Sequence, residues 1–300
     1  MKILVTGRDG QVVRSLIERA AGCDDTSIIA VGRPQLDLAV PETVFAAIAA
    51  HRPDLVVSAA AYTAVDQAED EPELARAINA TGAGAVATAA AKLDIPVIHL
   101  STDYVFAGDG ERAYTEEDAA GPQGVYGATK LAGEKAVRAA NPKHVILRTA
   151  WVYSPFGKNF VKTMLRLAES RDQVSVVSDQ WGNPTSALDI ADGILHIARR
   201  LPASGAPYGT YHLTGAGETN WSGFARTIFS ESRAAGGPWA DVVDIATSDY
   251  PTKARRPANS RLSNDKLHNT FGWMAPHWQD AVKYTVQRLT GNAAPSTGVA

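Results

Sequence analysis

The stretch Lys2-Ile-Leu-Val-Thr-Gly-Arg-Asp-Gly-Gln-Val-Val13 decides the fold. Its apolar run Ile3-Leu4-Val5 has the length and composition of a buried parallel strand, and helical apolar spacing begins at Val12. A strand, a glycine-containing turn and a helix N-terminus together form a pyrophosphate site, because the helix dipole and free backbone N–H groups meet its charge. The sequence therefore predicts that the chain opens with a dinucleotide-binding βα unit.

The glycines of this unit fit only part of the usual pattern, G-x-x-G-x-x-G. Gly7 is expected to make the turn, and Gly10 to let backbone approach a phosphate. Val13 occupies the third position, where glycine would allow the helix and the strand to pack tightly. We therefore expect Val13 to push the helix outward or to occupy a local gap. Taken alone, Gly-x-x-Gly also fits an ordinary turn between a strand and a helix.

Short apolar runs alternate with Ala-rich helical stretches as far as Arg148. This alternation predicts an α/β fold with a doubly wound, Rossmann-like parallel sheet, which binds ligands at the carboxyl ends of its strands. Residues 1–150 are expected to bind the dinucleotide. A smaller C-terminal region, 151–290, is expected to bind mainly substrate, with residues 175–200 returning to the sheet and 291–300 forming a tail. The expected strands are 27–31, 55–58, 97–101 and 145–148, and the expected helices are 41–50, 73–93, 130–140, 188–201 and 278–289.

Tyr126-Gly-Ala-Thr-Lys130 places a phenol and an ammonium one helical turn apart. A lysine beside a tyrosine can lower the pKa of the phenol and make it a general acid for a carbonyl that receives hydride. Such a pair also arises by chance, so neighbouring residues must decide. Ser101-Thr102-Asp103 lies upstream, at the end of an expected strand.

Arg33 follows the second expected strand, where NAD-selective proteins commonly carry an acidic residue for the ribose hydroxyls. Because arginine can bind a 2′-phosphate, the sequence predicts that NADPH is preferred over NADH. Asp37 supplies a nearby carboxylate, so we expect the preference to be modest and NADH still to be used.

The C-terminal region contains a basic loop that includes Arg255, Arg256 and Arg261. Guanidinium groups bind phosphate in a bidentate manner, so this loop could hold a diphosphate, although a solvated surface loop is the simpler reading. Trp151 could stack on a sugar or a base, or belong to the core.

Composition excludes several classes of function. The formal net charge of the 300 residues is −3, which does not favour binding to nucleic acid or to a membrane surface. The one cysteine, Cys23, excludes an internal disulfide and a cysteine-based metal cluster. The chain lacks an apolar run of transmembrane length and opens with a core strand instead of a targeting leader. A cytoplasmic location is expected.

Six motifs in order carry a resemblance to the extended short-chain dehydrogenase/reductase family, from Met1 to about Leu289. They are Gly7-x-x-Gly10-Gln11-Val12, Ser101-Thr-Asp-Tyr-Val-Phe106, Tyr126-Gly-x-Thr-Lys130-Leu-x-Gly-Glu134, Arg148-Thr-x-Trp151-Val-Tyr153, Asp179-Gln-x-Gly-x-Pro184-Thr185 and Arg256-Pro257-x-Asn259-Ser260. Within that family the match is to enzymes that act on nucleotide-linked 4-keto-6-deoxysugars.

The resemblance implies NAD(P)H-dependent reduction of the C4 ketone of such a sugar, with dTDP-4-dehydro-L-rhamnose as the expected substrate and dTDP-L-rhamnose as the product. It implies that Tyr126 is the acid, that Lys130 holds the nicotinamide ribose and tunes Tyr126, and that Thr102 steadies the substrate oxygen. Substrate would also contact Asp103, Trp151 and Arg256. The cofactor would contact Gly7, Gly10, Gln11, Val12, Arg33, Asp37, Leu38, Ala61, Tyr62, Thr63, Tyr126 and Lys130. A homodimer is expected by analogy, as is a magnesium ion that some relatives hold, although no acidic cluster in the sequence is assigned to it.

Other activities remain open to different degrees. Nucleotide-sugar dehydratases usually carry Asp-Glu directly after the threonine, whereas Tyr104 stands in the glutamate's place here, which argues against dehydration. Another nucleotide-sugar 4-reductase or an epimerase that retains its NAD is excluded less firmly. A non-catalytic regulatory subunit, of the methionine adenosyltransferase type, is the alternative outside catalysis. The sequence determines neither the nucleotide nor the face of the ketone that receives hydride.

Overall fold

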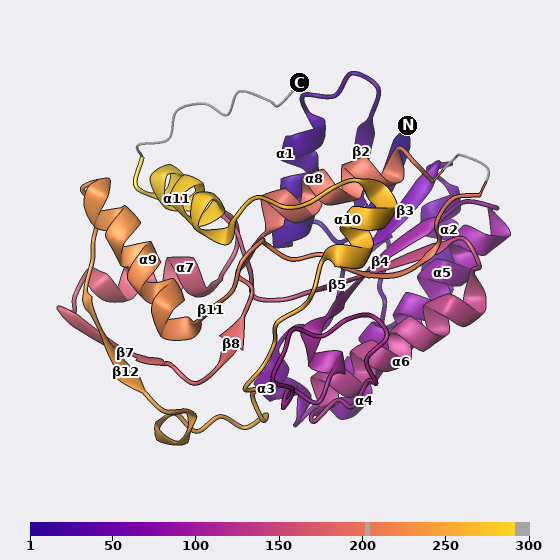
Figure 1. The fold of residues 1–300 in the computed structure, drawn as a ribbon. Helices are drawn as coiled ribbons and strands as arrows, with labels where there is room; N and C mark the ends of the chain where they lie inside the picture. The colour runs from indigo at the N-terminus through magenta and orange to yellow at the C-terminus, as the bar shows by residue number, and fades with distance from the viewer. Residues whose placement is uncertain (202–204, 292–300) are drawn as a thin grey trace.

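Six strands form one parallel sheet in the order β2-β1-β3-β4-β5-β10 (Figure 1). The strand order reverses at β1, because β2 lies on one side of it and β3 on the other. The predicted doubly wound parallel sheet is therefore confirmed, and its ligand crevice is expected outside the carboxyl ends of β1 and β3. The strands are β1 (Lys2–Thr6), β2 (Ser27–Val31), β3 (Leu55–Ser58), β4 (Val97–Thr102), β5 (His144–Thr149) and β10 (Gly209–His212).

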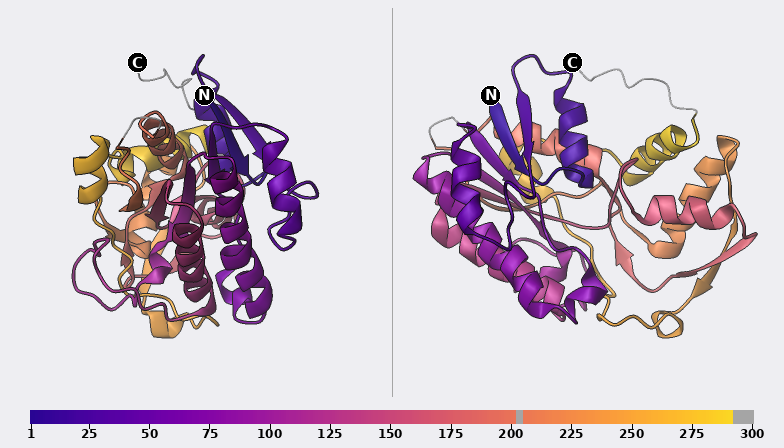
Figure 2. Two further views of the ribbon diagram at one scale, coloured as in Figure 1. Left: turned by 90° about the vertical axis from the view of Figure 1, so that its right-hand side faces the viewer. Right: turned by 180° about the vertical axis from the view of Figure 1, so that it is seen from behind.

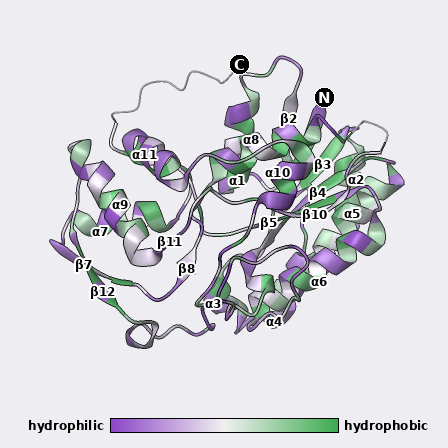
Figure 3. Cartoon of the chain, in the orientation of Figure 1, coloured by the Kyte–Doolittle hydropathy of each residue, from purple (hydrophilic) through white to green (hydrophobic). Residues whose placement is uncertain are grey.

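The computed structural model describes residues 1–201 and 205–291, so all but the first residue of the expected 291–300 tail lies outside the described residues. Helices cover both faces of the sheet (Figure 2). Side chains alternate between two cores: Ile3 and Val5 pack on one face and Leu4 on the other. The strands of this sheet are largely hydrophobic (Figure 3), as expected when both faces are buried.

The first face is covered by α1 (Gln11–Ala20), α8 (Ala187–Ala198) and α10 (Asp265–Phe271). The second is covered by α2 (Glu42–Ala49), α5 (Ala83–Lys92) and α6 (Val125–Ala140). Helix α6 begins before the expected boundary at residue 130, so Tyr126 lies in its first turn. The helix expected over 73–93 is divided into α4 (Pro72–Arg76), a π-helical turn (Ala77–Gly82) and α5, and is preceded by α3 (Val65–Ala68).

A second, smaller lobe has its own apolar core, in which Phe224 is fully buried. The right-hand view of Figure 2 shows this lobe beside the large sheet. Its helices are α7 (Phe160–Ala168), α9 (Trp221–Ala234) and α11 (Trp278–Leu289). Its strands pair two by two: β7 (Gln173–Val177) with β12 (Asp241–Ile245), β8 (Trp181–Gly182) with β11 (Thr219–Asn220), and β6 (Val152–Tyr153) with β9 (Thr185–Ser186). Two 3₁₀ turns complete the elements, at Asp103–Val105 and Thr247–Asp249.

The chain passes between the lobes within residues 175–200. Strand β7 pairs with β12 in the smaller lobe, whereas α8 packs against α1 of the larger one. The strand that extends the large sheet is β10, which the sequence analysis did not identify. Its residues Gly-Thr-Tyr-His are too short and too polar to be recognised as a core strand.

Val13 is buried at 3% exposure and contributes to the core between the sheet and α1. Of the two outcomes expected for it, the structure shows the local gap. A Cβ built on Gly7 would lie 3.4 Å from Cγ2 of Val13, so the side chain occupies space that the first glycine leaves free. Gly7 also has a φ of +103°, a conformation that other residues rarely adopt.

Gly133 of α6 is where this helix approaches the π-helical turn most closely. A Cβ at Gly133 would lie 2.1 Å from the carbonyl oxygen of Asn79, a backbone atom that cannot move aside alone. We expect Gly133→Ala to lower the free energy of unfolding by about 2 kcal/mol or more, as overpacking does. Urea unfolding measures this difference. Gly22→Ala is the control, because a Cβ there meets nothing within 4 Å; equal stability of the two variants would contradict the prediction.

Candidate active site

The N-terminus of α1 forms a backbone cradle at the carboxyl end of β1. Gly10 is its N-cap residue and no side chain caps the first turn, so backbone N–H groups there remain available to an anion. A Cβ at Gly32 would lie 3.3 Å from the backbone of Gly7, which shows how closely the loops after β1 and β2 approach. Gly10 is exposed, and the backbone N–H groups at this helix N-terminus suit the pyrophosphate of a dinucleotide. Val12, in the first turn of α1, is partly buried and packs against the core.

The loop after β3 is held against this cradle by hydrogen bonds. The hydroxyl of Thr6 accepts from the N–H groups of Ala59 and Ala60, at 3.0 Å each. The Asn79 side chain accepts from the Tyr62 N–H at 2.8 Å and donates to its carbonyl at 3.1 Å. Ala61 and Thr63, which flank Tyr62, are therefore presented beside the crevice on an ordered backbone.

Two arginines lie at the outer end of the cradle. Arg8 donates to the Gln35 side chain at 2.6 Å, and Arg33 is exposed in the same loop as Gln35. The Asp37 carboxylate accepts from the Ala39 N–H at 3.0 Å, so one of its oxygens caps its own loop. Leu38 is buried behind it and closes against Gly82.

The residues predicted for catalysis meet at the carboxyl end of β4. The Tyr126 phenol interacts with the side chain of Thr102. Thr102 donates to the Asp103 carboxylate at 2.8 Å and accepts from the Tyr104 N–H. Lys130 is buried at 3% exposure, and its ammonium donates to the carbonyl of Leu100 at 2.6 Å. The structure thus brings Thr102, Tyr126 and Lys130 together from β4 and α6.

The expected lowering of the Tyr126 pKa by Lys130 does not occur in this structure. Burial, and then the nearby charge of Asp103, raise the pKa of the Tyr126 phenol, and the bond with Thr102 offsets this only in part. Burial lowers the pKa of Lys130 to about 8, which the charge of Glu134 partly offsets. Spacing in the sequence placed the two groups on one helix face but could not show that the ammonium is bonded to a carbonyl.

Asp103 is a buried carboxyl group at 5% exposure. Burial raises its pKa to about 6, although bonds from Ser260 and Thr102 act in the opposite direction. Tyr104, the residue in the place of a dehydratase's glutamate, packs edge-on against the Tyr126 ring, with 5.5 Å between ring centroids. Burial and the charge of Asp103 raise the pKa of Tyr104 to about 12.

A cavity of about 430 Å³ opens beside Tyr104 and is lined from both lobes. Arg255 and Arg256 line it, and Arg256 is paired with the carboxylate of Asp66. Arg261 lies outside the lining and is bonded to Glu218 and Asn259 instead. Two of the three arginines that could hold a diphosphate therefore line this cavity.

Trp151 stacks on Trp221 with 3.7 Å between ring centroids. Its φ of +48° is unusual for a residue with a large side chain. A Cβ at Gly182 would lie 2.5 Å from the Trp151 ring, so the indole rests on bare backbone. Trp151 is half-buried where the two lobes meet.

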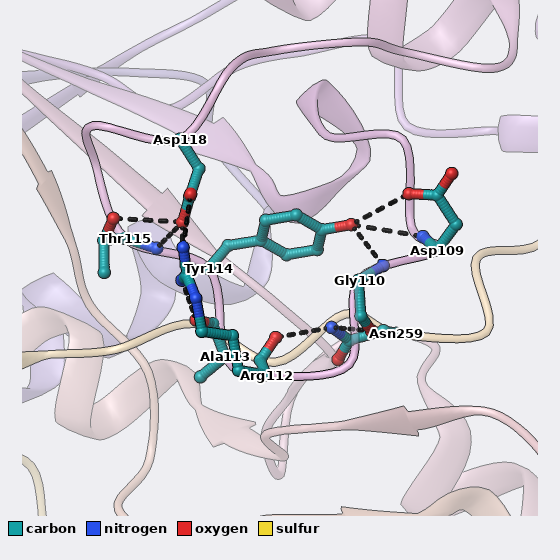
Figure 4. Close-up of polar contacts among 8 residues, drawn as sticks. All are labelled: Asp109, Gly110, Arg112, Ala113, Tyr114, Thr115, Asp118 and Asn259. Atoms are coloured by element: carbon teal, nitrogen blue, oxygen red, sulfur yellow. Dashed lines mark hydrogen bonds and ion pairs between the residues drawn. The ribbon is translucent and has the colours of Figure 1, made fainter.

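The loop that forms one wall of the cavity is organised around a single phenol (Figure 4). The Tyr114 hydroxyl accepts from the N–H groups of Gly108, Asp109 and Gly110 at 2.9–3.1 Å. Asn259 donates to two carbonyls of the same loop, those of Gly110 and Arg112. The cavity wall is thus held by hydrogen bonds from both lobes.

Sequence reasoning missed several residues of this site. Arg8 lies between the two turn glycines and was given no role, and Asn79 lies inside an expected helix. The motif residues Glu134 and Arg148 were noted without a role. Only their spacing in the motifs could have drawn attention to them, since their partners come from distant parts of the chain.

Comparisons with known proteins identify the family of this chain. The family model described as RmlD substrate binding domain matches residues 1–290. A relative named dTDP-4-dehydrorhamnose reductase, from Sinorhizobium fredii, is 50% identical over 96% of this chain and 98% of its own length. The chain belongs to the dTDP-4-dehydrorhamnose reductase family.

Solved structures of that family share the fold. A dTDP-4-dehydrorhamnose reductase from Clostridium acetobutylicum matches with a TM-score of 0.89 at 38% identity, covering 96% of this chain and 99% of its own. One from Bacillus anthracis, in complex with NADP, matches with a TM-score of 0.88 at 35% identity over the same shares. The predicted family resemblance is confirmed.

The described residues also bear on the expected magnesium ion and on membrane binding. Among residues 1–201 and 205–291, no group of three or more His, Cys, Asp or Glu side chains is arranged to hold a metal ion. Over the same described ranges, none of the helices combines the length and apolar character needed to span a membrane.

The raised pKa of Asp103 makes stability depend on pH. The folded protein binds the Asp103 proton more tightly than the unfolded chain does, so this stabilisation is complete below about pH 4 and is lost as the pH rises through about 6. Asp103→Asn should therefore gain stability relative to the parent protein between pH 4 and pH 7, by up to roughly 3 kcal/mol. Urea unfolding at both pH values measures the gain. Asp24→Asn, at an exposed position, controls for the loss of one carboxylate. If the difference in free energy of unfolding between Asp103→Asn and the parent protein is the same at both pH values, the prediction is contradicted.

Proposed function

We propose that this protein reduces the C4 ketone of a nucleotide-linked 4-keto-6-deoxysugar with NAD(P)H, converting dTDP-4-dehydro-L-rhamnose to dTDP-L-rhamnose. The observation that carries the proposal is the meeting of Thr102, Tyr126 and Lys130 at the end of β4. These residues lie beside the uncapped N-terminus of α1 and a cavity lined by arginines. The names of the relatives support the same reaction.

The cofactor, when bound, supplies the hydride. Its pyrophosphate would lie on the backbone of Gly7, Gly10, Gln11 and Val12, and its remaining contacts would come from Arg33, Asp37, Leu38, Ala61, Tyr62, Thr63 and Lys130. Residues 1–150, with α8, α10 and β10 packed on the same sheet, form this half of the site, and the rest of 151–290 mainly binds substrate. NADPH is the preferred form, since Arg8 and Arg33 are placed at the outer end of the cradle.

Tyr126 donates the proton that the new hydroxyl requires. Its raised pKa keeps the phenol protonated, which is the state a general acid needs before the reaction. The Thr102 side chain meets the phenol, so both hydroxyls can bond the oxygen on which negative charge develops. Lys130 places a positive charge near that point and offers its ammonium to the ribose of the cofactor.

Substrate is held from the smaller lobe and the cavity. Arg256 would exchange part of its contact with Asp66 for the diphosphate, and Trp151 and Asp103 would line the sugar. Reduction needs no group that removes a sugar C5 proton. Tyr104, with a pKa raised to about 12, is poorly suited to the acid–base work of a dehydratase. We also propose a cytoplasmic homodimer, by analogy with relatives.

The reaction can be measured directly. With dTDP-4-dehydro-L-rhamnose (dTDP-4-dehydro-6-deoxy-L-mannose) we expect one NADPH to be oxidised for each sugar reduced. We expect dTDP-glucose to be recovered unchanged. Tyr126→Phe should lower kcat by about 10²-fold or more while cofactor binding survives, because general acid catalysis contributes roughly that factor. Absorbance of NADPH and NMR of the sugar products give the readouts.

Each alternative function predicts a different outcome of these assays. Conversion of dTDP-glucose to a 4-keto-6-deoxysugar without net NADPH oxidation would identify a dehydratase. A new sugar epimer without net NADPH oxidation would identify an epimerase. Inertness toward both sugars would favour a regulatory protein, and normal turnover by Tyr126→Phe would remove that residue from the mechanism. The configuration of the product at C4 follows from the same NMR spectra.

Cofactor preference is tested at the two arginines. Arg33→Ala and Arg8→Ala should each lower kcat/KM for NADPH by roughly tenfold, the loss of one charged hydrogen bond, and leave kcat/KM for NADH unchanged. Arg171→Ala, at an exposed position of the smaller lobe, is the matched control. Equal kcat/KM values for the two cofactors in all four proteins would show that neither arginine meets a 2′-phosphate.

A further inference from the structure

Three side chains of α6 lie on one stripe of the helix, because they are four residues apart: Tyr126, Lys130 and Glu134. Each of them reaches the same strand, β4. Tyr126 meets the Thr102 side chain, and Lys130 donates to the Leu100 carbonyl at 2.6 Å. The third, Glu134, accepts from the Ser101 hydroxyl at 2.6 Å. The helix is thus attached to the strand at three successive residues.

Glu134 is completely buried, and its carboxylate has further partners besides Ser101. Arg148 of β5 donates to both of its oxygens, from Nε at 2.9 Å and from Nη2 at 2.8 Å. Arg148 is itself 4% exposed. Arg138, whose side chain is 38% exposed, reaches the same carboxylate from the solvent side. One carboxylate therefore joins α6 to two neighbouring strands.

The two strand residues that bind Glu134 lie side by side in the sheet. Ser101 and Arg148 are direct partners in the pairing of β4 with β5. Both side chains point to the face covered by α6, as Val97 and Ile146 do earlier on the same strands. The other buried polar side chains of β3 and β4 on this face, Ser58 and His99, are bonded to each other, so sliding α6 along the sheet would leave a buried charge without its partner.

We propose that Glu134 is a positioning residue for the reaction: by binding Ser101 and Arg148 together, it sets the register of α6 on the sheet and so places Tyr126 against Thr102. This inference rests on the proposed roles of Tyr126 and Lys130. Glu134 touches neither the substrate nor the cofactor in this scheme. It acts through the helix that carries the acid.

Glu134 also affects the charge of Lys130, one turn away. Its carboxylate favours the protonated ammonium, in opposition to burial. The other groups facing this region are Tyr126 on the same helix, His99 on β4 and Arg148 on β5. His99 is buried with its pKa well below its usual range, so it is neutral and does not compete with Lys130. Removal of the Glu134 charge should therefore shift deprotonation of Lys130 to lower pH.

The test compares Glu134→Gln with the parent enzyme over a range of pH. We expect kcat to fall tenfold or more and the KM for the nucleotide sugar to stay within twofold. We also expect the basic limb of the kcat profile to move to lower pH by about one unit. Arg138→Ala is the control, because it removes the solvent-side partner of the same carboxylate; its kcat should stay within twofold. A folded Glu134→Gln enzyme with the parent kcat and pH profile would overturn the proposal.

Glu134→Gln leaves Arg148 buried without its charged partner, so a second variant guards against misfolding. The double variant Glu134→Met with Arg148→Met removes both charges at once. Its kcat should still fall tenfold or more, because the contacts that set the register of α6 on the sheet are lost with the pair. Parent-like kcat in the double variant, or failure of both variants to fold, would limit Glu134 to a role in stability and overturn the proposal.

Different results would reject the catalytic role of Tyr126 and the positioning role of Glu134. Normal turnover by Tyr126→Phe would remove the proposed catalytic role itself. Impaired turnover by Tyr126→Phe, combined with parent-like kcat in the Glu134 variants, would leave the reductase function intact and reject only the positioning role.

Discussion

A fully buried carboxylate, that of Glu134, joins three elements that the chain supplies separately. Burying an ion pair yields little net stability, because desolvation of both groups opposes their attraction. Removing one partner is a different matter and costs about 3–5 kcal/mol, since the other charge is then left uncompensated. Such a pair therefore favours one packing arrangement over its neighbours more than it stabilises the fold. In this protein the arrangement it favours is the one that brings α6 to the end of β4.

Backbone proximity is the second constraint, and glycines make it possible. The loops after β1 and β2 touch at Gly7 and Gly32, and α6 meets the π-helical turn at Gly133. Val13 illustrates how such packing adapts: the bulk that the usual third glycine avoids is accommodated beside Gly7. The cradle at the helix N-terminus is retained, because it depends on free N–H groups and not on the side chain at position 13.

The two lobes are joined across the site by polar contacts. Asp66, just beyond the loop that follows β3, pairs with Arg256 and accepts from the backbone of Ala254. Asp70 pairs with Lys253. These bonds tie the arginine loop of the smaller lobe to the cofactor half of the larger one. The Asp70–Lys253 pair is exposed on both sides and contributes little to stability, whereas the Arg256 side chain is only 20% exposed.

The sequence alone determined the βα unit at the N-terminus, most strand positions and the residues Thr102, Tyr126 and Lys130. These features are local: periodicity, turn glycines and spacing along a helix are readable within a few residues. Residues 55–58 and 278–289 form the strand and the helix that were expected there. Family motifs extended this local reading to substrate and cofactor.

Only the tertiary structure decided the rest. It showed that Lys130 is bonded to a backbone carbonyl, that Tyr126 is made a weaker acid by burial, and that β10 completes the sheet. It also brought Glu134, Ser101 and Arg148 into one cluster. The physical reason is that pKa values and hydrogen-bond partners depend on desolvation and on groups far away in the chain, and neither is encoded in local spacing.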